Sequence, residues 1–268
     1  MPRQRHRVLH RMNFESPYVE MPMRLTVRQN LTVFARAARR NGGSGRWTLE
    51  RIFELFPNLR ARERIPAIRP ANTQYNDQFE VPTLQEVIDL AKAQSAAKGR
   101  VIAIEPETKH PTYFKSIGLP LEKPLLATLE KNGWNHRGAP VFVQSFEVSN
   151  LKEISKLSSV RLAQLINGSG RPYDFVVEGA SNTRTYADMV TPAGLKEIAS
   201  YAYAVGPYKE WIIPFVRVNG VATELGAPTN LVKDAHAAGL VVHTWTLRPE
   251  NSFLPASLKG APTRSEEH

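Results

Sequence analysis

Three charged side chains alternate along the stretch "VIAIEPETKHPTYF", residues 101–114. Glu105, Glu107 and Lys109 are spaced two residues apart, so they point to one side wherever the chain is extended. The apolar residues before them predict a buried strand, and charges are costly to bury unless they are paired or bind a ligand. A carboxylate beside an ammonium at a strand end suits a hard divalent cation and a phosphate group. The alternative is a solvated Glu–Lys pair on a loop, which contributes little.

Two later strands also end in side chains that can contact a ligand. Gln144 closes the apolar run "APVFVQSF" and can donate a hydrogen bond to a substrate oxygen. Trp245, in "LVVHTWTL", is a candidate pocket wall, with Arg248 as a candidate anion contact; core packing and solvent exposure are the respective alternatives. His243 alternates with Trp245, but a lone strand histidine is more often a satisfied core residue. The chain has no Gly-x-Ser-x-Gly, so a serine hydrolase gains no support.

Elements that position these residues alternate along the chain from about residue 60. Apolar stretches predict strands at 101–106, 139–146, 160–167 and 240–247. Periodic stretches between them predict helices at 81–99, 122–134, 148–157, 191–202 and 229–239. Thr83 and Glu86 form a capping-box pattern, Thr191 with Pro192 predicts a helix start, and Ser149 or Asn150 is expected to open the helix at 148–157.

Strand-then-helix repeats predict a parallel sheet buried on both faces. An open doubly wound sheet and a closed eight-stranded barrel are the two candidate architectures. No GxGxxG follows a strand, which weakens the dinucleotide-binding alternative. Polar residues recur at the carboxyl ends of several strands, which is typical of a TIM-type (β/α)8 barrel. They are Glu107, Lys109, Gln144, Gln164, Asn167, Trp245 and Arg248.

The beginning of the chain differs in composition from the remainder. Residues 1–64 hold fourteen Arg, five Glu and neither Lys nor Asp, so most of the net charge of +10 lies there. We therefore expect a divergent Arg-rich segment at 1–58 and a barrel domain at 59–268. The segment is either a phosphate-binding arm or the product of a shifted reading frame or misplaced start. Its basic start has no apolar stretch behind it, so we expect no signal peptide. The chain has no run of 18 or more apolar residues, so we expect no membrane span. The chain has no cysteine, which excludes disulfides and thiolate chemistry.

Five ordered segments between residues 59 and 257 resemble glycerophosphodiester phosphodiesterases of the longer, often exported bacterial type. They are "LRARERIPAIRPANTQYNDQFEVPTLQEVIDLA", "IEPETKHPTYFKSIGLPLEKPLL", "APVFVQSFEVSNLKEI", "GPYKEWIIP" and "AGLVVHTWTLRPENSFLP". The resemblance implies a (β/α)8 barrel with a bound Ca²⁺ or Mg²⁺. It also implies a small-molecule substrate, a glycerophosphodiester hydrolysed to glycerol 3-phosphate and an alcohol. Because the chain after residue 64 is nearly neutral, we expect no nucleic acid as partner.

The same resemblance assigns roles to single residues. The Glu of the family's Pro-Glu-x-Lys stretch is a metal ligand and falls on Glu107, and the Lys contacts the substrate phosphate and falls on Lys109. Gln144 and Trp245 match residues of the substrate pocket.

The beginning of the chain departs from the family pattern. Family members open with strands that end in His-Arg-Gly, in Glu-Pro-Asp and in a second histidine, and the two histidines are the acid and base. None of these motifs is intact here. The stretch "SPYVEMPMRLT" is weakly similar to the second and makes Glu20 a metal ligand, with Pro22 where the Asp would stand. The barrel is thus expected to be incomplete or divergent over its first three strands.

The identity of the acid and base is consequently unknown, and we expect little or no phosphodiesterase activity, because such groups typically contribute about 10²- to 10⁴-fold each. Two alternatives follow. One is a catalytically inactive remnant that binds phosphodiesters or a partner. The other is a nucleic-acid binder that acts through its arginine-rich start.

Overall fold

The computed structural model describes residues 61–248 and 250–260. The chain divides into two units, and the second, described over residues 62–76, 84–248 and 250–260, contains every helix and strand named below. In the first unit, residues 61 and 77–83 are described, and the Ala61 N–H donates to the Phe79 carbonyl oxygen at 2.7 Å. The predicted boundary between residues 58 and 59, like the whole Arg-rich segment, lies outside the described residues.

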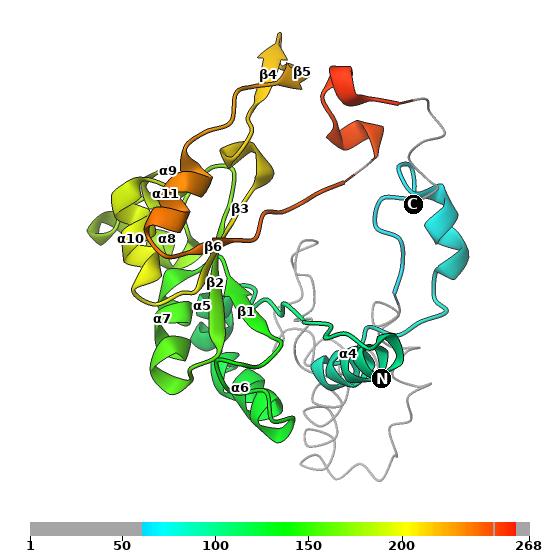
Figure 1. The fold of residues 1–268 in the computed structure, drawn as a ribbon, viewed down its shortest axis with the longest axis vertical. Helices are drawn as coiled ribbons and strands as arrows, with labels where there is room; N and C mark the ends of the chain where they lie inside the picture. Colours follow the sequence, from blue (N-terminus) through cyan, green and yellow to red (C-terminus); the bar gives the residue numbers. More distant parts are fainter. Residues whose placement is uncertain (1–60, 249, 261–268) are drawn as a thin grey trace, which may run out of the picture. The chain divides into compact units, whose positions relative to one another are not determined.

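Four parallel strands form the central sheet in the order β1-β2-β3-β6 (Figure 1). They are β1 (Phe142–Ser145), β2 (Arg161–Ile166), β3 (Ala204–Pro207) and β6 (Val241–Val242). An extended segment, residues 104–108, pairs in parallel with β1. Its hydrogen bonds run from the Ile104 N–H to the Pro140 oxygen at 3.0 Å and from the Gln144 N–H to the Pro106 oxygen at 2.9 Å. Five neighbouring parallel segments therefore follow one another in chain order.

Helices and turns connect the strands. The α-helices are α4 (Leu84–Lys98), α5 (Pro111–Ser116), α6 (Glu122–Lys131), α7 (Val148–Leu157), α8 (Tyr173–Glu178), α9 (Tyr186–Met189), α10 (Pro192–Ala199) and α11 (Leu231–Ala237). The 3₁₀ turns are η2 (Pro70–Tyr75), η3 (Gly179–Ser181), η4 (Lys209–Trp211), η5 (Asn251–Phe253) and η6 (Ala256–Leu258). Between β3 and β6 the chain also forms an antiparallel hairpin of β4 (Phe215–Val218) and β5 (Val221–Leu225). No helix of the described part is long and apolar enough to cross a bilayer.

The predicted strands at 139–146 and 160–167 are confirmed as β1 and β2, and the last strand is confirmed but is only two residues long. The stretch 101–106 is not a regular strand; its backbone pairs with β1 at single bridges. Strand β3 has no counterpart among the predictions. Its sequence, Ala-Val-Gly-Pro, has two residues that are disfavoured in strands, and only its full burial reveals it as one.

Two helix starts illustrate local and distant capping. The start predicted at Thr191 is confirmed, because its hydroxyl accepts the Gly194 N–H at 3.1 Å and Pro192 follows as the first helical residue. The start of α7 was predicted at Ser149 or Asn150, but the helix begins at Val148. The Ser149 N–H donates to Asp174 Oδ2 at 2.7 Å, so a carboxylate from α8 provides the cap that a local side chain was expected to provide.

The apolar core lies between the sheet and the helices, and α7, α8, α10 and α11 lie on one side of the sheet (Figure 1). One cluster joins α4, α6 and α7 to β1 and β2 through residues such as Ile88, Leu129 and Leu151. A second cluster joins the helices α8, α9, α10 and α11 to the strands β2 and β3 through residues such as Leu195 and Ile198. The alternate residues of the strands face the opposite side, which is the interior of a barrel.

The contact between the side chains of Glu105 and His243 indicates how far the strands are tilted. The backbone register runs from Glu107 through β1, β2 and β3 to Val241, so residue 109 is level with His243 along the hydrogen bonds. The His243 side chain nevertheless meets Glu105, with Nδ1 and Oε1 2.7 Å apart. An offset of four residues over four pairings is one residue per strand, which equals the offset in an eight-stranded barrel with a shear number of 8. The predicted fold class is confirmed, and the prediction that the barrel is incomplete or divergent over its first three strands falls on residues outside the described part.

Candidate functional site

Thr108 fixes the direction of its two neighbours. It is only 1% exposed, and its N–H donates to the Gln144 carbonyl oxygen at 2.8 Å. Its carbonyl oxygen accepts the Ser145 hydroxyl at 3.0 Å, and its own hydroxyl donates to Asn150 Oδ1 at 2.5 Å. Because side chains alternate along an extended segment, burying Thr108 on the helix side directs Glu107 and Lys109 to the other side.

Glu107 is half-buried and lies beside Gln144 on β1. Its Oε1 atom is buried and has no hydrogen-bond partner within the described part of the chain. An unpaired carboxylate oxygen in such a place is costly, and a hard cation would satisfy it. Lys109 is exposed. The Gln144 amide donates to the Glu105 carbonyl oxygen at 3.1 Å, so part of its donor capacity is used inside the protein.

Trp245 belongs to an aromatic wall that we define as Phe146, Tyr208 and Trp245. Its ring meets Phe146 edge-on at 5.5 Å and Tyr208 at 5.2 Å between centroids, and its Nε1 donates to the Gly206 carbonyl oxygen at 2.8 Å. Glu105 and His243 are related by an offset of one residue per strand. The same offset places Trp245 at the same height in the barrel as Glu107. These two predicted site residues therefore share one layer of the barrel interior, above the layer of Glu105 and His243.

The Glu105–His243 pair was not predicted. The alternation of Glu105 with Glu107 was visible in the sequence, but the partner is 138 residues away and requires knowledge of which strands face each other. The Phe142 ring lies against His243, with centroids 4.7 Å apart. A carboxylate that accepts from Nδ1–H would orient the imidazole ring.

Two other strand-end predictions have different outcomes. Gln164 was grouped with the polar strand ends, but it is fully buried on the helix side. Its amide donates to the Leu165 carbonyl oxygen at 3.0 Å, and its Oε1 accepts the Tyr201 hydroxyl at 2.9 Å, so it is a structural residue. The same burial raises the pKa of Tyr201. Arg248 lies over the Phe253 ring at 4.7 Å. The second predicted metal ligand, Glu20, lies outside the described residues.

The described residues offer few side chains that could bind a cation together with Glu107. Within residues 61–248 and 250–260, no group of three or more His, Cys, Asp or Glu side chains is arranged to hold a metal ion. Glu107 alone therefore does not make a complete cation site there, and a bound Ca²⁺ or Mg²⁺ would need further oxygen ligands or water.

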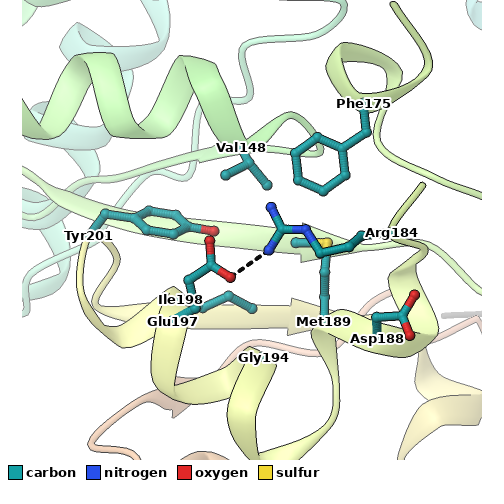
Figure 2. Close-up of a pocket in the computed structure, with 9 residues that line it drawn as sticks. All are labelled: Val148, Phe175, Arg184, Asp188, Met189, Gly194, Glu197, Ile198 and Tyr201. Carbon is teal, nitrogen blue, oxygen red and sulfur yellow. Dashed lines mark hydrogen bonds and ion pairs between the residues drawn. The ribbon is translucent and has the colours of Figure 1, made fainter. Parts of the chain in front are cut away.

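A small pocket also lies on the helix side of the sheet (Figure 2). It has a volume of about 20 Å³ and is lined by residues of α8, α9 and α10. Its charged side chains already have partners: Arg184 contacts Glu197 at 2.5 Å and lies over the Phe175 ring at 4.7 Å. The Asp188 carboxylate accepts from the Thr185 N–H and hydroxyl. Since the space holds about one water molecule, it is not a candidate for substrate binding.

Comparisons of this chain with known proteins all lead to one family of phosphodiesterases. The sequence model of the glycerophosphoryl diester phosphodiesterase family matches residues 34–259. A glycerophosphodiester phosphodiesterase of Arabidopsis thaliana is 31% identical over 225 residues, which are 79% of this chain and 55% of that protein. One from Treponema pallidum is 26% identical over 196 residues, 70% of this chain and 52% of that protein. The chain thus spans about half the length of these relatives.

A solved structure from Silicibacter pomeroyi, described as a glycerophosphoryl diester phosphodiesterase, has a TM-score of 0.43 to this chain and 18% sequence identity. The match covers 65% of this chain and 49% of that one.

Proposed function

The chain belongs to the glycerophosphoryl diester phosphodiesterase family, and on that premise we propose that it hydrolyses glycerophosphodiesters to glycerol 3-phosphate and an alcohol with a bound Ca²⁺ or Mg²⁺. The observation that carries this proposal is the position of Glu107 and Lys109, two residues apart, at the end of the first described parallel segment. Glu107 presents a buried oxygen without a hydrogen-bond partner in the described part. Lys109, two residues on, is exposed on the same side of an extended backbone.

Each residue has a distinct part in the reaction. Glu107 would hold the cation through its carboxylate, and Lys109 would neutralise charge on a non-bridging phosphate oxygen. When bound, the cation supplies Lewis-acid polarisation of the phosphoryl group. Water adds to phosphorus, the ester bond between phosphorus and the alcohol oxygen breaks, and the alcohol leaves with a proton.

The aromatic wall suits the non-reacting part of the substrate. Phe146, Tyr208 and Trp245 are each half-buried, so part of each ring remains accessible. Glycerol carbons can pack on such rings while the hydroxyl groups keep polar partners. Gln144, in the neighbouring strand, is the polar group nearest in register to Glu107. We therefore assign Gln144 and Trp245 to substrate binding.

The test uses the purified chain with glycerophosphocholine and detects glycerol 3-phosphate. We expect slow hydrolysis that stops on chelation and returns with Ca²⁺ or Mg²⁺. Replacing Glu107 with Gln should lower kcat/KM by at least about 100-fold, because metal polarisation of the phosphoryl group contributes several kcal/mol. Glu153→Gln, a change at a carboxylate on the outer helix α7, is the matched control and should leave the rate unchanged.

Calcium binding is measured separately by calorimetry, because the missing histidine motifs predict a low rate. Hydrolysis that is indifferent to both chelation and Glu107→Gln would refute the proposal. Binding of Ca²⁺ and substrate without turnover would identify the alternative, an inactive protein that binds phosphodiesters.

A further inference from the structure

A buried polar network lies behind the segment that carries Glu107 and Lys109. Its members come from β1, α6, α7, α8, the connection between β1 and α7, and the segment itself, and none is more than 4% exposed. They are Thr108, Glu122, Ser145, Glu147, Asn150 and Asp174. We call this set the buried polar network. It lies on the helix side of the sheet, opposite the proposed cation site.

Asn150 connects the segment to a helix. Its Oδ1 accepts the Thr108 hydroxyl at 2.5 Å, and its Nδ2 donates to Glu122 Oε1 at 2.5 Å. Glu122 is the first residue of α6, so the residue between Glu107 and Lys109 is tied through one amide to two helices. An apolar residue at position 150 would leave the Thr108 hydroxyl and the Glu122 carboxylate without these partners.

Glu147 holds the other end of the same segment. Its Oε2 accepts the N–H of Thr112, the second residue of α5, at 3.0 Å. Its own N–H donates to the Ser145 hydroxyl at 3.2 Å, and that hydroxyl donates to the Thr108 carbonyl oxygen. Lys109 therefore lies between two fixed points, Thr108 and Thr112. The turn between them passes through His110, whose φ of 53° is in the left-handed region.

The buried polar network lowers the stability of the folded chain. Glu122 and Glu147 are both 2% exposed, and each has one buried carboxylate oxygen without a hydrogen-bond partner among the described residues. Burial raises the pKa of Glu147, and Asp174, a third buried carboxylate, raises it further. An apolar core would avoid these costs. Local departures from good packing of this kind are expected where function requires a fixed geometry.

We propose that Asn150 and Glu147 are positioning residues that hold Glu107 and Lys109 in the orientation needed to bind a cation and a phosphate together. The inference rests on the proposed function of those two residues. Neither Asn150 nor Glu147 would touch the substrate, because both act from the helix side through the backbone and hydroxyl of Thr108 and the amide of Thr112.

Three variants and one control of the full chain test the inference. Asn150→Leu and Glu147→Met remove the hydrogen bonds while keeping side-chain volume. Glu147→Gln keeps an oxygen that can accept the Thr112 N–H. Ile154→Val weakens the core from the same helix, α7, without touching the network. Two quantities are measured, the Kd for Ca²⁺ by calorimetry and the hydrogen exchange of residues 105–116.

Asn150→Leu and Glu147→Met should raise the Kd for Ca²⁺ by about 10- to 100-fold, the range seen when groups that orient metal ligands are removed. Exchange of the Thr108 and Thr112 amides should become faster in both. Glu147→Gln should restore values close to those of the unmodified chain, and Ile154→Val should leave both quantities unchanged although it also lowers stability. If Asn150→Leu does not fold, Thr108→Val compared with Thr108→Ser takes its place.

An unchanged Kd together with unchanged exchange in Asn150→Leu and Glu147→Met would overturn the inference. An equal effect of Ile154→Val would also overturn it, because general destabilisation would then explain the result. If the unmodified chain binds no Ca²⁺, the proposed function fails, and hydrogen exchange alone decides whether the two residues hold the segment.

Discussion

The first and fifth parallel segments of the sheet each carry one predicted site residue, but they hold it by different means. Glu107 is oriented by hydrogen bonds that fix Thr108 through its N–H, its carbonyl oxygen and its hydroxyl. The backbone of Trp245 is hydrogen-bonded to Pro207 and Lys209. Its side chain has one hydrogen bond, to the Gly206 oxygen, and otherwise packs on the rings of Phe146 and Tyr208.

This difference follows from what each side chain has to do. A hydrogen bond weakens steeply when its angle changes, so a hydrogen-bonded support fixes direction closely. Aromatic packing depends mainly on contact area and allows several ring arrangements of similar energy. A carboxylate that ligates a cation needs the first kind of support, and a wall against which a substrate packs needs only the second. The segment of Glu107 should therefore respond to the loss of single polar atoms, and the surroundings of Trp245 to the loss of volume.

Among changes that remove a single polar group, the largest effect on stability is expected at Thr108. Thr108→Val keeps the shape but leaves Asn150 Oδ1 buried without its donor. We expect the free energy of unfolding to fall by about 1–3 kcal/mol, the usual cost of an unsatisfied buried polar group. Chemical denaturation measures it, with Thr108→Ser as a control that keeps the hydroxyl. Equal stability of the Val and Ser variants would show that the hydroxyl is not what holds this segment.

Glu147 provides the next effect, and it depends on pH. Burial, with the nearby Asp174 and Glu122 carboxylates, raises the pKa of Glu147 from 4.5 to about 6, although the Thr112 N–H opposes this. The group is therefore bound to its proton more tightly in the folded chain. Its contribution to stability is fully present below pH 4.5 and is lost as the pH rises through about 6.

Glu147→Gln should remove this dependence. When the pH is raised from below 4.5 to above 6, the free energy of unfolding of the variant should therefore increase by about 2 kcal/mol relative to that of the unmodified chain. The charged and titratable groups around Glu147, which include Asp174, Glu122 and Tyr186, are the same in both proteins. Denaturant titrations between pH 4 and 8 measure the difference. Parallel stability curves for the two proteins would contradict a raised pKa.

Trp245→Phe is expected to have a smaller effect. Phe can keep the contacts with Phe146 and Tyr208 but lacks the donor to the Gly206 oxygen, so the free energy of unfolding should fall by only about 1 kcal/mol. Trp245→Ala, which removes the ring, should cost clearly more, and thermal denaturation can compare the two. If Phe were as damaging as Ala, the hydrogen bond and not the packing would hold this wall.

The smallest effect is expected for the exposed ion pair between Lys115 on α5 and Glu153 on α7, 2.5 Å apart. These two helices are near the same segment that the buried polar network fixes, but both side chains of the pair are solvated. Lys115→Met should change the free energy of unfolding by less than about 1 kcal/mol, as for most surface pairs. A loss as large as that of Thr108→Val would show that burial is not what distinguishes the network.

The sequence was most informative where a local pattern determines the structure. The alternation of Glu107 with Lys109, the cap at Thr191 and the strands β1 and β2 could all be predicted within a few residues. Gln164 was misassigned although its own strand carries the correction: Leu162 and Ile166 share its face, so it points toward the helices. Strand β3 could not be predicted because its burial comes from its neighbours in the sheet.

The residues that support the site were beyond local reasoning. Asn150 is 42 residues from Thr108 and 28 from Glu122, and His243 is 138 from Glu105. No spacing rule connects such positions, because their contacts exist only after parallel strands and helices have packed. The role of each partner depends on the tilt of the strands, which a single sequence does not specify.

The advance of one position per strand also limits how this chain can change in length. Deleting a single residue within β6 would turn Trp245 toward the helices and separate His243 from Glu105, because neighbouring side chains point to opposite faces. The connection that holds the β4–β5 hairpin lies between β3 and β6 and ends before α11. It can lengthen or shorten without altering which face any strand residue occupies. Homologues should therefore accumulate insertions in that connection while the spacing from Val241 to Trp245 stays constant.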